Sequence, residues 1–315
     1  MDLTAVLDAR NRIAPYLNPT PLYNYPALSE LVGTEVWVKH ENHLPTAAFK
    51  VRGGLNLAAQ LTDDERQAGL VAASTGNHGQ SIAYAAKTFG TQAIICVPEG
   101  ANPTKVDGIR RWGATIVEVG RDFDDAREHS EKLAQREGYR YVHSGDEPHL
   151  IAGVGTYALE IFEELPDVDV IIVPVGGGSG AAGACVVAAA VNPSTEVIGV
   201  QSAQAPAGYR SWKAGSLVED QMGTFAEGLA TRTAFEYPQK IMREHLSDFV
   251  LVDDDDIRAA MLQLIQITRN LVEAAGAAGA AAALQMKEQL AGKKVVVIMS
   301  GGNIAVPQLR ELLAG

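Results

Sequence analysis

Residues 170–180 read VIIVPVGGGSG, and this stretch decides the fold class. Its apolar first half, residues 170–175, predicts a buried strand, and the Ala-rich segment 181–191 that follows predicts a helix. Similar apolar runs recur at residues 70–73, 93–97, 115–119, 196–200 and 294–299, with helical patterns between most of them. Strands that alternate with helices in this way predict an α/β protein built on parallel sheet.

The glycine-rich loop after the first of these strands consists of Gly176, Gly177, Gly178, Ser179 and Gly180. Glycine lets the backbone approach a ligand closely, and a helix N-terminus favours negative charge. A plain turn would need only one or two glycines. The loop therefore predicts a phosphate-binding site.

A dinucleotide site is the competing interpretation of this loop, because residues 178–183 fit the pattern G-x-G-x-x-G. That pattern also needs an acidic residue at the end of the next strand, where it holds the ribose. Glu196 opens the next strand, and Gln201 stands at its end. We therefore do not expect a nicotinamide cofactor.

Lys50 lies in the small and apolar segment TAAFKVRGG at residues 46–54. An apolar environment disfavours the ammonium form and lowers the pKa of the amine, which can then attack a carbonyl and hold it as an imine. A solvated surface lysine is the ordinary alternative. The neighbouring motifs favour the reactive amine.

Two further polar loops follow apolar runs. The segment STGNHGQ at residues 74–80 precedes a helical pattern and offers donors to an anion, and SGGN at residues 300–303 ends another predicted strand. Ligands of open α/β sheets bind beyond the carboxyl ends of the strands, so these loops predict one crevice. A ligand for that crevice and Lys50 needs an aldehyde, a phosphate and a group that meets a serine hydroxyl. Pyridoxal phosphate has all three.

The composition disfavours several classes of protein. A chain of 315 residues with 47% hydrophobic and 20% charged residues can bury a large core. The net charge of −12 disfavours nucleic acid and anionic membranes, which require a basic face. No run approaches the roughly 20 apolar residues of a membrane span, and no signal peptide is visible. We therefore expect a cytoplasmic location.

Residue types that commonly bind metals show no metal-binding pattern. Cys96 and Cys185 lie in apolar segments and are expected to be buried core residues. His40 and His43 lack accompanying ligands at zinc spacing. The four aspartates at residues 253–256 lack the glycine of a calcium loop, and we expect them to cap a helix over residues 257–270.

Together with Thr20, Pro21 and Leu22, the four motifs resemble in the same order those of the threonine and serine dehydratases. These form a branch of the fold type II pyridoxal-phosphate enzymes that also contains serine racemase. The resemblance implies a two-lobed, parallel-sheet fold like that of tryptophan synthase β. Residues 1–66 and 147–315 would form a large cofactor-binding domain, with a small α/β domain inserted at residues 67–146. We also expect a homodimer or larger homo-oligomer and, since the chain ends at Gly315, no C-terminal regulatory domain.

The resemblance also implies roles for the site residues. Lys50 would form the imine with the cofactor, and Phe49 would pack against its pyridine ring. Asn77 would hydrogen-bond the phenolic oxygen, and Ser300 would face the pyridine nitrogen. The substrate carboxylate would lie among Ser74, Thr75, Gly76, Asn77 and His78. The phosphate would be held by Gly176, Gly177, Gly178, Ser179 and Gly180, where the family usually has four consecutive glycines.

The implied activity is the dehydration and deamination of a β-hydroxy amino acid to a 2-oxo acid and ammonia. Ser300 favours elimination, because a hydroxyl leaves the pyridine nitrogen neutral and makes the ring a weaker electron sink. The residues do not decide between threonine, serine, 3-phenylserine and 3-hydroxyaspartate as the substrate.

Three alternatives remain open: a serine racemase, a β-replacement synthase, and a non-catalytic ligand-binding protein. At the position of Thr75, racemases carry a serine that exchanges a proton, and many dehydratases carry alanine. The extra methyl of threonine restricts its rotamers and crowds the substrate's α-carbon, so we expect slow racemisation or none. Thr75 is therefore a second candidate catalytic residue beside Lys50.

Related enzymes often bind a divalent cation through a Glu and an Asp that follow the strand after the glycine loop. In this chain the corresponding places hold Gln201 and Ala207. Hard cations need anionic oxygen ligands, so we expect no metal at this position.

Overall fold

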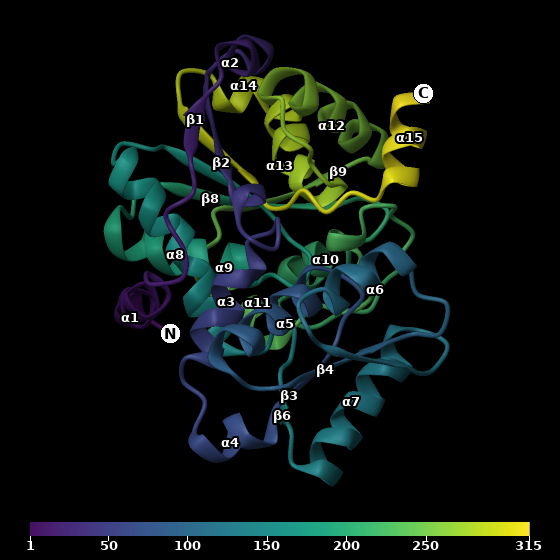
Figure 1. The fold of residues 1–315 in the computed structure, drawn as a ribbon. Coiled ribbons are helices and arrows are strands. Elements are labelled where there is room, and N and C mark those ends of the chain that lie inside the picture. Colours follow the sequence, from purple (N-terminus) through teal and green to yellow (C-terminus); the bar gives the residue numbers. More distant parts are fainter. Residues whose placement is uncertain (315) are drawn as a thin grey trace.

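The computed structural model describes residues 1–314 and contains two β-sheets (Figure 1). The larger sheet has the strand order β1-β2-β10-β7-β8-β9, and only the pair β1 and β2 is antiparallel. Its strands are β1 (Leu22–Asn24), β2 (Glu35–His40), β7 (Val170–Pro174), β8 (Glu196–Ser202), β9 (Asp248–Val252) and β10 (Lys294–Met299). The predicted α/β fold with parallel sheet is confirmed.

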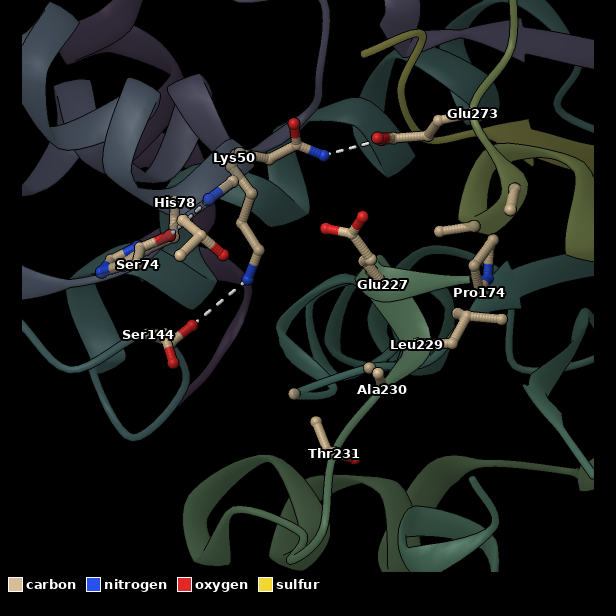
Figure 2. Close-up of a pocket in the computed structure, with 18 of the residues that line it drawn as sticks. Lys50, Ser74, His78, Ser144, Pro174, Glu227, Leu229, Ala230, Thr231 and Glu273 are labelled. Carbon is tan, nitrogen blue, oxygen red and sulfur yellow. Dashed lines mark hydrogen bonds between the residues drawn. The ribbon is translucent and has the colours of Figure 1, made fainter. Parts of the chain in front are cut away.

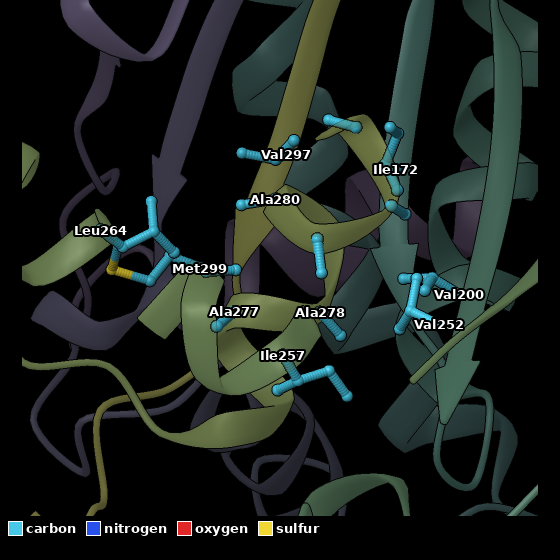
Figure 3. Close-up of a cluster of buried hydrophobic side chains, with 14 of the residues drawn as sticks. Ile172, Val200, Val252, Ile257, Leu264, Ala277, Ala278, Ala280, Val297 and Met299 are labelled. Atoms are coloured by element: carbon cyan, nitrogen blue, oxygen red, sulfur yellow. The ribbon is translucent and has the colours of Figure 1, made fainter. Parts of the chain in front are cut away.

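Helices cover both faces of the larger sheet, and every residue of its central strands β7 and β10 except Lys294 is buried. Ile172 and Val297 pack into the core on one face, and their neighbours Ile171 and Val296 pack into the core on the other (Figure 3 shows the first). The first face is covered by α2 (Pro26–Val32), α12 (Asp254–Thr268), α13 (Ala274–Gln285), α14 (Lys287–Leu290) and α15 (Val306–Ala314). The second is covered by α1 (Leu3–Ile13), α8 (Pro148–Glu164), α9 (Ser179–Val191), α10 (Ala207–Ala214) and α11 (Glu236–His245).

The smaller sheet is parallel throughout and has the strand order β5-β4-β3-β6. Its strands are β3 (Leu70–Ala73), β4 (Ala93–Val97), β5 (Thr115–Glu118) and β6 (Arg140–Tyr141), and its helices are α4 (Asp63–Ala68), α5 (Asn77–Phe89), α6 (Pro103–Arg110) and α7 (Phe123–Glu137). The chain enters this sheet after β2 and returns to the larger one at β7. This order agrees with an insertion, whereas the boundaries at residues 67 and 146 stay a prediction.

Helix α3 (Lys50–Ala58) joins the two parts of the molecule, since it packs against both α5 and α8. Gly53 and Gly54 permit these close approaches, because a Cβ at either position would overlap Leu150 of α8 or Ser81 of α5. The residue that begins α3 therefore lies between the two sheets.

Several local expectations can be compared with the structure. Cys96 and Cys185 are buried, as predicted. The helix predicted over residues 257–270 begins earlier, at Asp254, because the aspartates form its first turn, where carboxylates favour the helix dipole. Within the described part of the chain, no helix combines the length and apolar character needed to cross a membrane.

Candidate active site

A cavity of about 720 Å³ brings together every site residue that the sequence predicts (Figure 2). It is lined by Phe49, Lys50, Ser74, Thr75, Gly76, Asn77, His78, Gly176, Gly177, Gly178, Ser179, Gly180 and Ser300. These residues come from the starts of α3, α5 and α9 and from the end of β10. The three polar loops therefore meet in one crevice, while the roles assigned to single residues remain predictions.

Lys50 is the first residue of α3, and its amine has only neutral hydrogen-bond partners. Nζ donates to Ser179 Oγ at 2.9 Å and to the carbonyl of Ser144 at 3.2 Å (Figure 2 marks the second bond). Burial lowers the pKa of Lys50 to about 8, because the surroundings disfavour the ammonium ion. At this pKa about a tenth of the amine is neutral at pH 7 and available as a nucleophile.

The segment before Lys50 is held against the loop that follows β10. Phe49 donates its backbone N–H to the carbonyl of Ser300 at 3.0 Å, and Gly302 donates to the carbonyl of Ala47 at 2.9 Å. Ala47 has a φ of 52°, a strained value for a residue other than glycine. The lysine segment and the SGGN motif, whose residues Lys50 and Ser300 are 250 positions apart, are therefore joined by two backbone hydrogen bonds.

The glycine-rich loop leads directly into the first turn of α9. Gly178 is the N-cap with a φ of 87°, and no side chain caps the backbone N–H groups of this turn. A Cβ at Gly176 would overlap the carbonyl of Gly228, and one at Gly177 would overlap the ring of Phe235. Bare backbone at the positive end of a helix is the arrangement that binds a phosphate.

The segment 74–78 lies at the first turn of α5, which begins at Asn77. Ser74 Oγ accepts the backbone N–H of Gly76 at 3.1 Å, and Gly76 caps the helix without a side chain. The ring of His78 is buried, and its Nε2 bonds the carbonyl of Val142 at 3.2 Å. Burial lowers the pKa of His78 to about 3, so this ring is neutral at physiological pH.

Several cavity residues escaped the sequence reasoning. Ser144 follows β6, a strand of two residues whose polar sequence gives no strand signal. Asn303 belongs to a predicted motif, yet its bond to Asn77 at 2.7 Å could not be inferred from spacing. Glu273 also bonds Asn77 at 2.7 Å, and it stands before the Ala-rich helix α13 in no recognisable motif.

Neutral residues occupy the two positions at which related enzymes often carry the carboxylate ligands of a divalent cation. Gln201 is buried, and its Oε1 accepts the backbone N–H of Tyr209 at 3.0 Å, close to Ala207 at the start of α10. His40 and His43 stack with ring centroids 4.8 Å apart. Among residues 1–314, no group of three or more His, Cys, Asp or Glu side chains could hold a metal ion.

Comparison with known proteins adds independent evidence. The family model described as pyridoxal-phosphate dependent enzyme matches residues 13–301. The chain is 37% identical to an L-threonine ammonia-lyase of Thermotoga maritima over 99% of this chain and 78% of that protein. It is 36% identical to an L-threo-3-hydroxyaspartate ammonia-lyase of Saccharomyces cerevisiae, with 98% and 95% covered.

Solved structures of two similar proteins superpose closely on this chain. Maize serine racemase superposes with a TM-score of 0.94 at 30% identity, covering 99% of this chain and 97% of that one. Threonine deaminase isoform 2 of Solanum lycopersicum superposes with a TM-score of 0.93 at 30% identity, covering 100% and 94%. A serine racemase and a threonine deaminase are thus both among the structures similar to this chain.

The cavity suits the cofactor that this family uses. Pyridoxal phosphate carries an aldehyde and a phosphate, and the cavity offers a lysine amine of lowered pKa and an uncapped helix start with glycine backbone. Gly176 and Gly177 let the loop pack closely against Gly228 and Phe235, which a Cβ at either position would overlap.

Proposed function

Because the chain belongs to the pyridoxal-phosphate dependent enzymes, we propose that it eliminates water from a β-hydroxy amino acid and releases a 2-oxo acid and ammonia. The observation that carries this proposal is the amine of Lys50, which lies in the cavity among neutral partners. The named activities of the ammonia-lyases that resemble the chain support it.

In this proposal Lys50 serves twice. Its amine would hold the cofactor through the aldehyde carbon, and its free neutral form would accept the α-proton of the substrate at Nζ. The bound cofactor supplies the electron sink that makes this proton acidic. Ser179 Oγ and the Ser144 carbonyl accept hydrogen bonds from Nζ and hold the freed amine in the cavity.

The remaining groups bind and orient. Backbone N–H groups at the start of α5, with Ser74 and Thr75, would bind the substrate carboxylate, since a helix N-terminus favours an anion. The loop 176–180 would bind the cofactor phosphate, and Asn77 its phenolic oxygen. Phe49 would pack on the pyridine ring, and Ser300 would face its nitrogen. His78 would contribute its backbone N–H, because its ring is engaged with Val142.

A serine racemase is the second candidate, favoured by the similarity to maize serine racemase and by the hydroxyl of Thr75. Racemisation needs a proton donor on the face opposite Lys50. The methyl group of Thr75 hinders that role by crowding the α-carbon. We therefore propose elimination as the main reaction.

The test is to incubate the cofactor-loaded protein with L-threonine, L-serine, 3-hydroxyaspartate and 3-phenylserine and to measure 2-oxo acid and ammonia. With L-serine, pyruvate and D-serine are followed together. Pyruvate should form faster than D-serine, and the reverse order would identify a racemase. No product from any of the four substrates would leave the β-replacement synthase and the non-catalytic ligand-binding protein as the remaining alternatives.

We further propose that residues 67–146 form a small domain inserted into the larger one, as the two sheets suggest. We also propose that the protein forms a homodimer or larger homo-oligomer and that it is located in the cytoplasm. Light scattering in solution and limited proteolysis near residues 67 and 146 test these points.

A further inference from the structure

Glu273 is an acidic side chain of the cavity that belongs to none of the sequence motifs. It is the N-cap residue of α13, yet its side chain makes no hydrogen bond to that helix. Instead Oε1 accepts an N–H of the Asn77 amide at 2.7 Å, which Figure 2 marks with a dashed line. The carboxylate thus turns away from the helix that it could cap and toward the start of α5.

The Asn77 amide is held from its other side as well. Nδ2 of Asn303 donates to the carbonyl of Thr46 at 2.8 Å and to Oδ1 of Asn77 at 2.7 Å. Both N–H groups of Asn303 are therefore used, and Oδ1 of Asn77 is fixed as their acceptor. This chain of bonds joins the lysine segment, the loop after β10 and the start of α5.

These partners determine which way the Asn77 amide points. An inverted amide would bring its NH₂ group against that of Asn303 and its oxygen against the carboxylate of Glu273, two contacts without a hydrogen bond. In the observed orientation, one N–H of Asn77 goes to Glu273 and the second remains for another acceptor.

The position of the Glu273 carboxylate depends on a glycine. The Glu273 backbone N–H donates to the carbonyl of Gly301 at 3.1 Å, and a Cβ on Gly301 would overlap Oε1 of Glu273. This close approach explains why position 301, the first glycine of the SGGN motif, has no side chain. Burial raises the pKa of Glu273 and the Asn77 bond opposes that shift, so the amide stabilises the ionised form.

We propose that Glu273 is a positioning residue for the cofactor: by accepting one N–H of Asn77, it directs the other N–H toward the phenolic oxygen of bound pyridoxal phosphate. This inference rests on the role proposed above for Asn77. Glu273 itself does not touch the reacting atoms.

The experiment compares Glu273→Leu, Glu273→Gln, Gly301→Ala and Asn77→Ala. Apo protein is titrated with pyridoxal phosphate, and the dissociation constant and the ratio of the visible to the near-ultraviolet absorption band are measured. Glu273→Leu should weaken binding about tenfold, the effect of one lost bond to a charged group, and should reduce the visible band. Glu273→Gln should stay within about twofold, because its amide oxygen accepts the same N–H.

Gly301→Ala is an independent probe, since it keeps the carboxylate and displaces it from Asn77. It should change the band ratio in the same direction as Glu273→Leu. Glu311→Gln is the matched control, because Glu311 is an exposed carboxylate at the rim of the same cavity, and it should leave both quantities unchanged. Thermal unfolding of each variant verifies that it is folded.

The outcomes separate the two proposals. Wild-type affinity and spectrum in both Glu273→Leu and Gly301→Ala, with both quantities altered in Asn77→Ala, would overturn the inference and leave the role of Asn77 intact. An unaltered spectrum in Asn77→Ala would overturn the role of Asn77 itself. A Gln variant as impaired as the Leu variant would also count against positioning by this hydrogen bond.

Discussion

Lys50 and Arg52 stand two residues apart on α3, and burial affects both, yet their acid–base properties move in opposite directions. The pKa of Lys50 falls to about 8 through burial. Burial also disfavours the charge of Arg52, but Glu41 and Glu160 outweigh it and raise the pKa of the guanidinium. Charged partners, rather than burial, decide which of the two cations becomes a reactive base.

The helix itself produces the separation. Successive residues turn by about 100°, so residues 50 and 52 point about 200° apart. One side chain enters the cavity, and the other enters a closed network in which Arg52 donates to Glu41 at 2.7 Å and to Glu160 at 2.6 Å. Lys39 also pairs with Glu160 at 2.6 Å, so two cations meet two carboxylates. Thr20, which precedes Pro21 and Leu22 in the sequence resemblance, donates its hydroxyl to Glu41 at 2.6 Å and joins the network.

Replacing Lys50 should have the largest effect. Lys50→Ala should reduce 2-oxo acid formation by at least about 10²–10⁴-fold, the contribution of proton transfer alone. Borohydride reduction of the loaded protein followed by peptide mapping should label Lys50. Lys39 is the internal control, because it forms a buried ion pair with Glu160 and does not line the cavity. A label on Lys39 would contradict the contrast between the paired and the unpaired cation.

Replacing Arg52, the cation that is paired with buried carboxylates, should reduce the stability of the fold. Arg52→Met leaves the buried Glu41 without a cationic partner and Glu160 with Lys39 alone, and it should lower the free energy of unfolding by about 3–5 kcal/mol. The control is Arg10→Met. Arg10 of α1 forms an ion pair with Glu163 of α8, the helix that also carries Glu160, and the two side chains are 38% and 50% exposed. That variant should lose about 0–1 kcal/mol. Equal shifts of the urea midpoint in the two variants would mean that burial of the network is irrelevant.

The unpaired side predicts a pH dependence. Only the neutral amine attacks the aldehyde, so attachment of pyridoxal phosphate to apo protein should accelerate as the pH rises and level off above about 8. Stopped-flow absorbance measures the rate, and a free amino-acid lysine derivative in the same buffers corrects for titration of the cofactor. A rate that keeps rising toward about pH 10 would show an ordinary lysine.

Sequence reasoning found one side of this comparison and missed the other. The presence of Lys50 and the glycine-rich loop in one cavity was predictable because each lies in a recognisable local sequence pattern, although the hydrogen-bond partners of Lys50 are 94 and 129 residues away. Arg52 stands in the same quoted segment, but its partners come from 11 and 108 residues away, and no local pattern announces them. The parallel sheets followed from continuous apolar runs, whereas the two-residue strand β6 and the contacts of Glu273 depend on tertiary packing alone.

The smallest expected effect sharpens the comparison at the lysine itself. Ser179 stands where the family usually has glycine, and its Oγ accepts a bond from Nζ of Lys50 at 2.9 Å. An acceptor favours the ammonium form, so Ser179→Gly should lower the pKa of Lys50 further. One neutral hydrogen bond contributes about 0.5–1.5 kcal/mol, which corresponds to a shift of at most about one pH unit. The stopped-flow pH profile should therefore move to lower pH in Ser179→Gly and stay in place in Ser179→Thr, which keeps the hydroxyl. A shift of the Ser179→Gly profile to higher pH would contradict this prediction. It would mean that the Ser179 hydroxyl donates a hydrogen bond to the neutral amine of Lys50 and thereby stabilises the nucleophilic form.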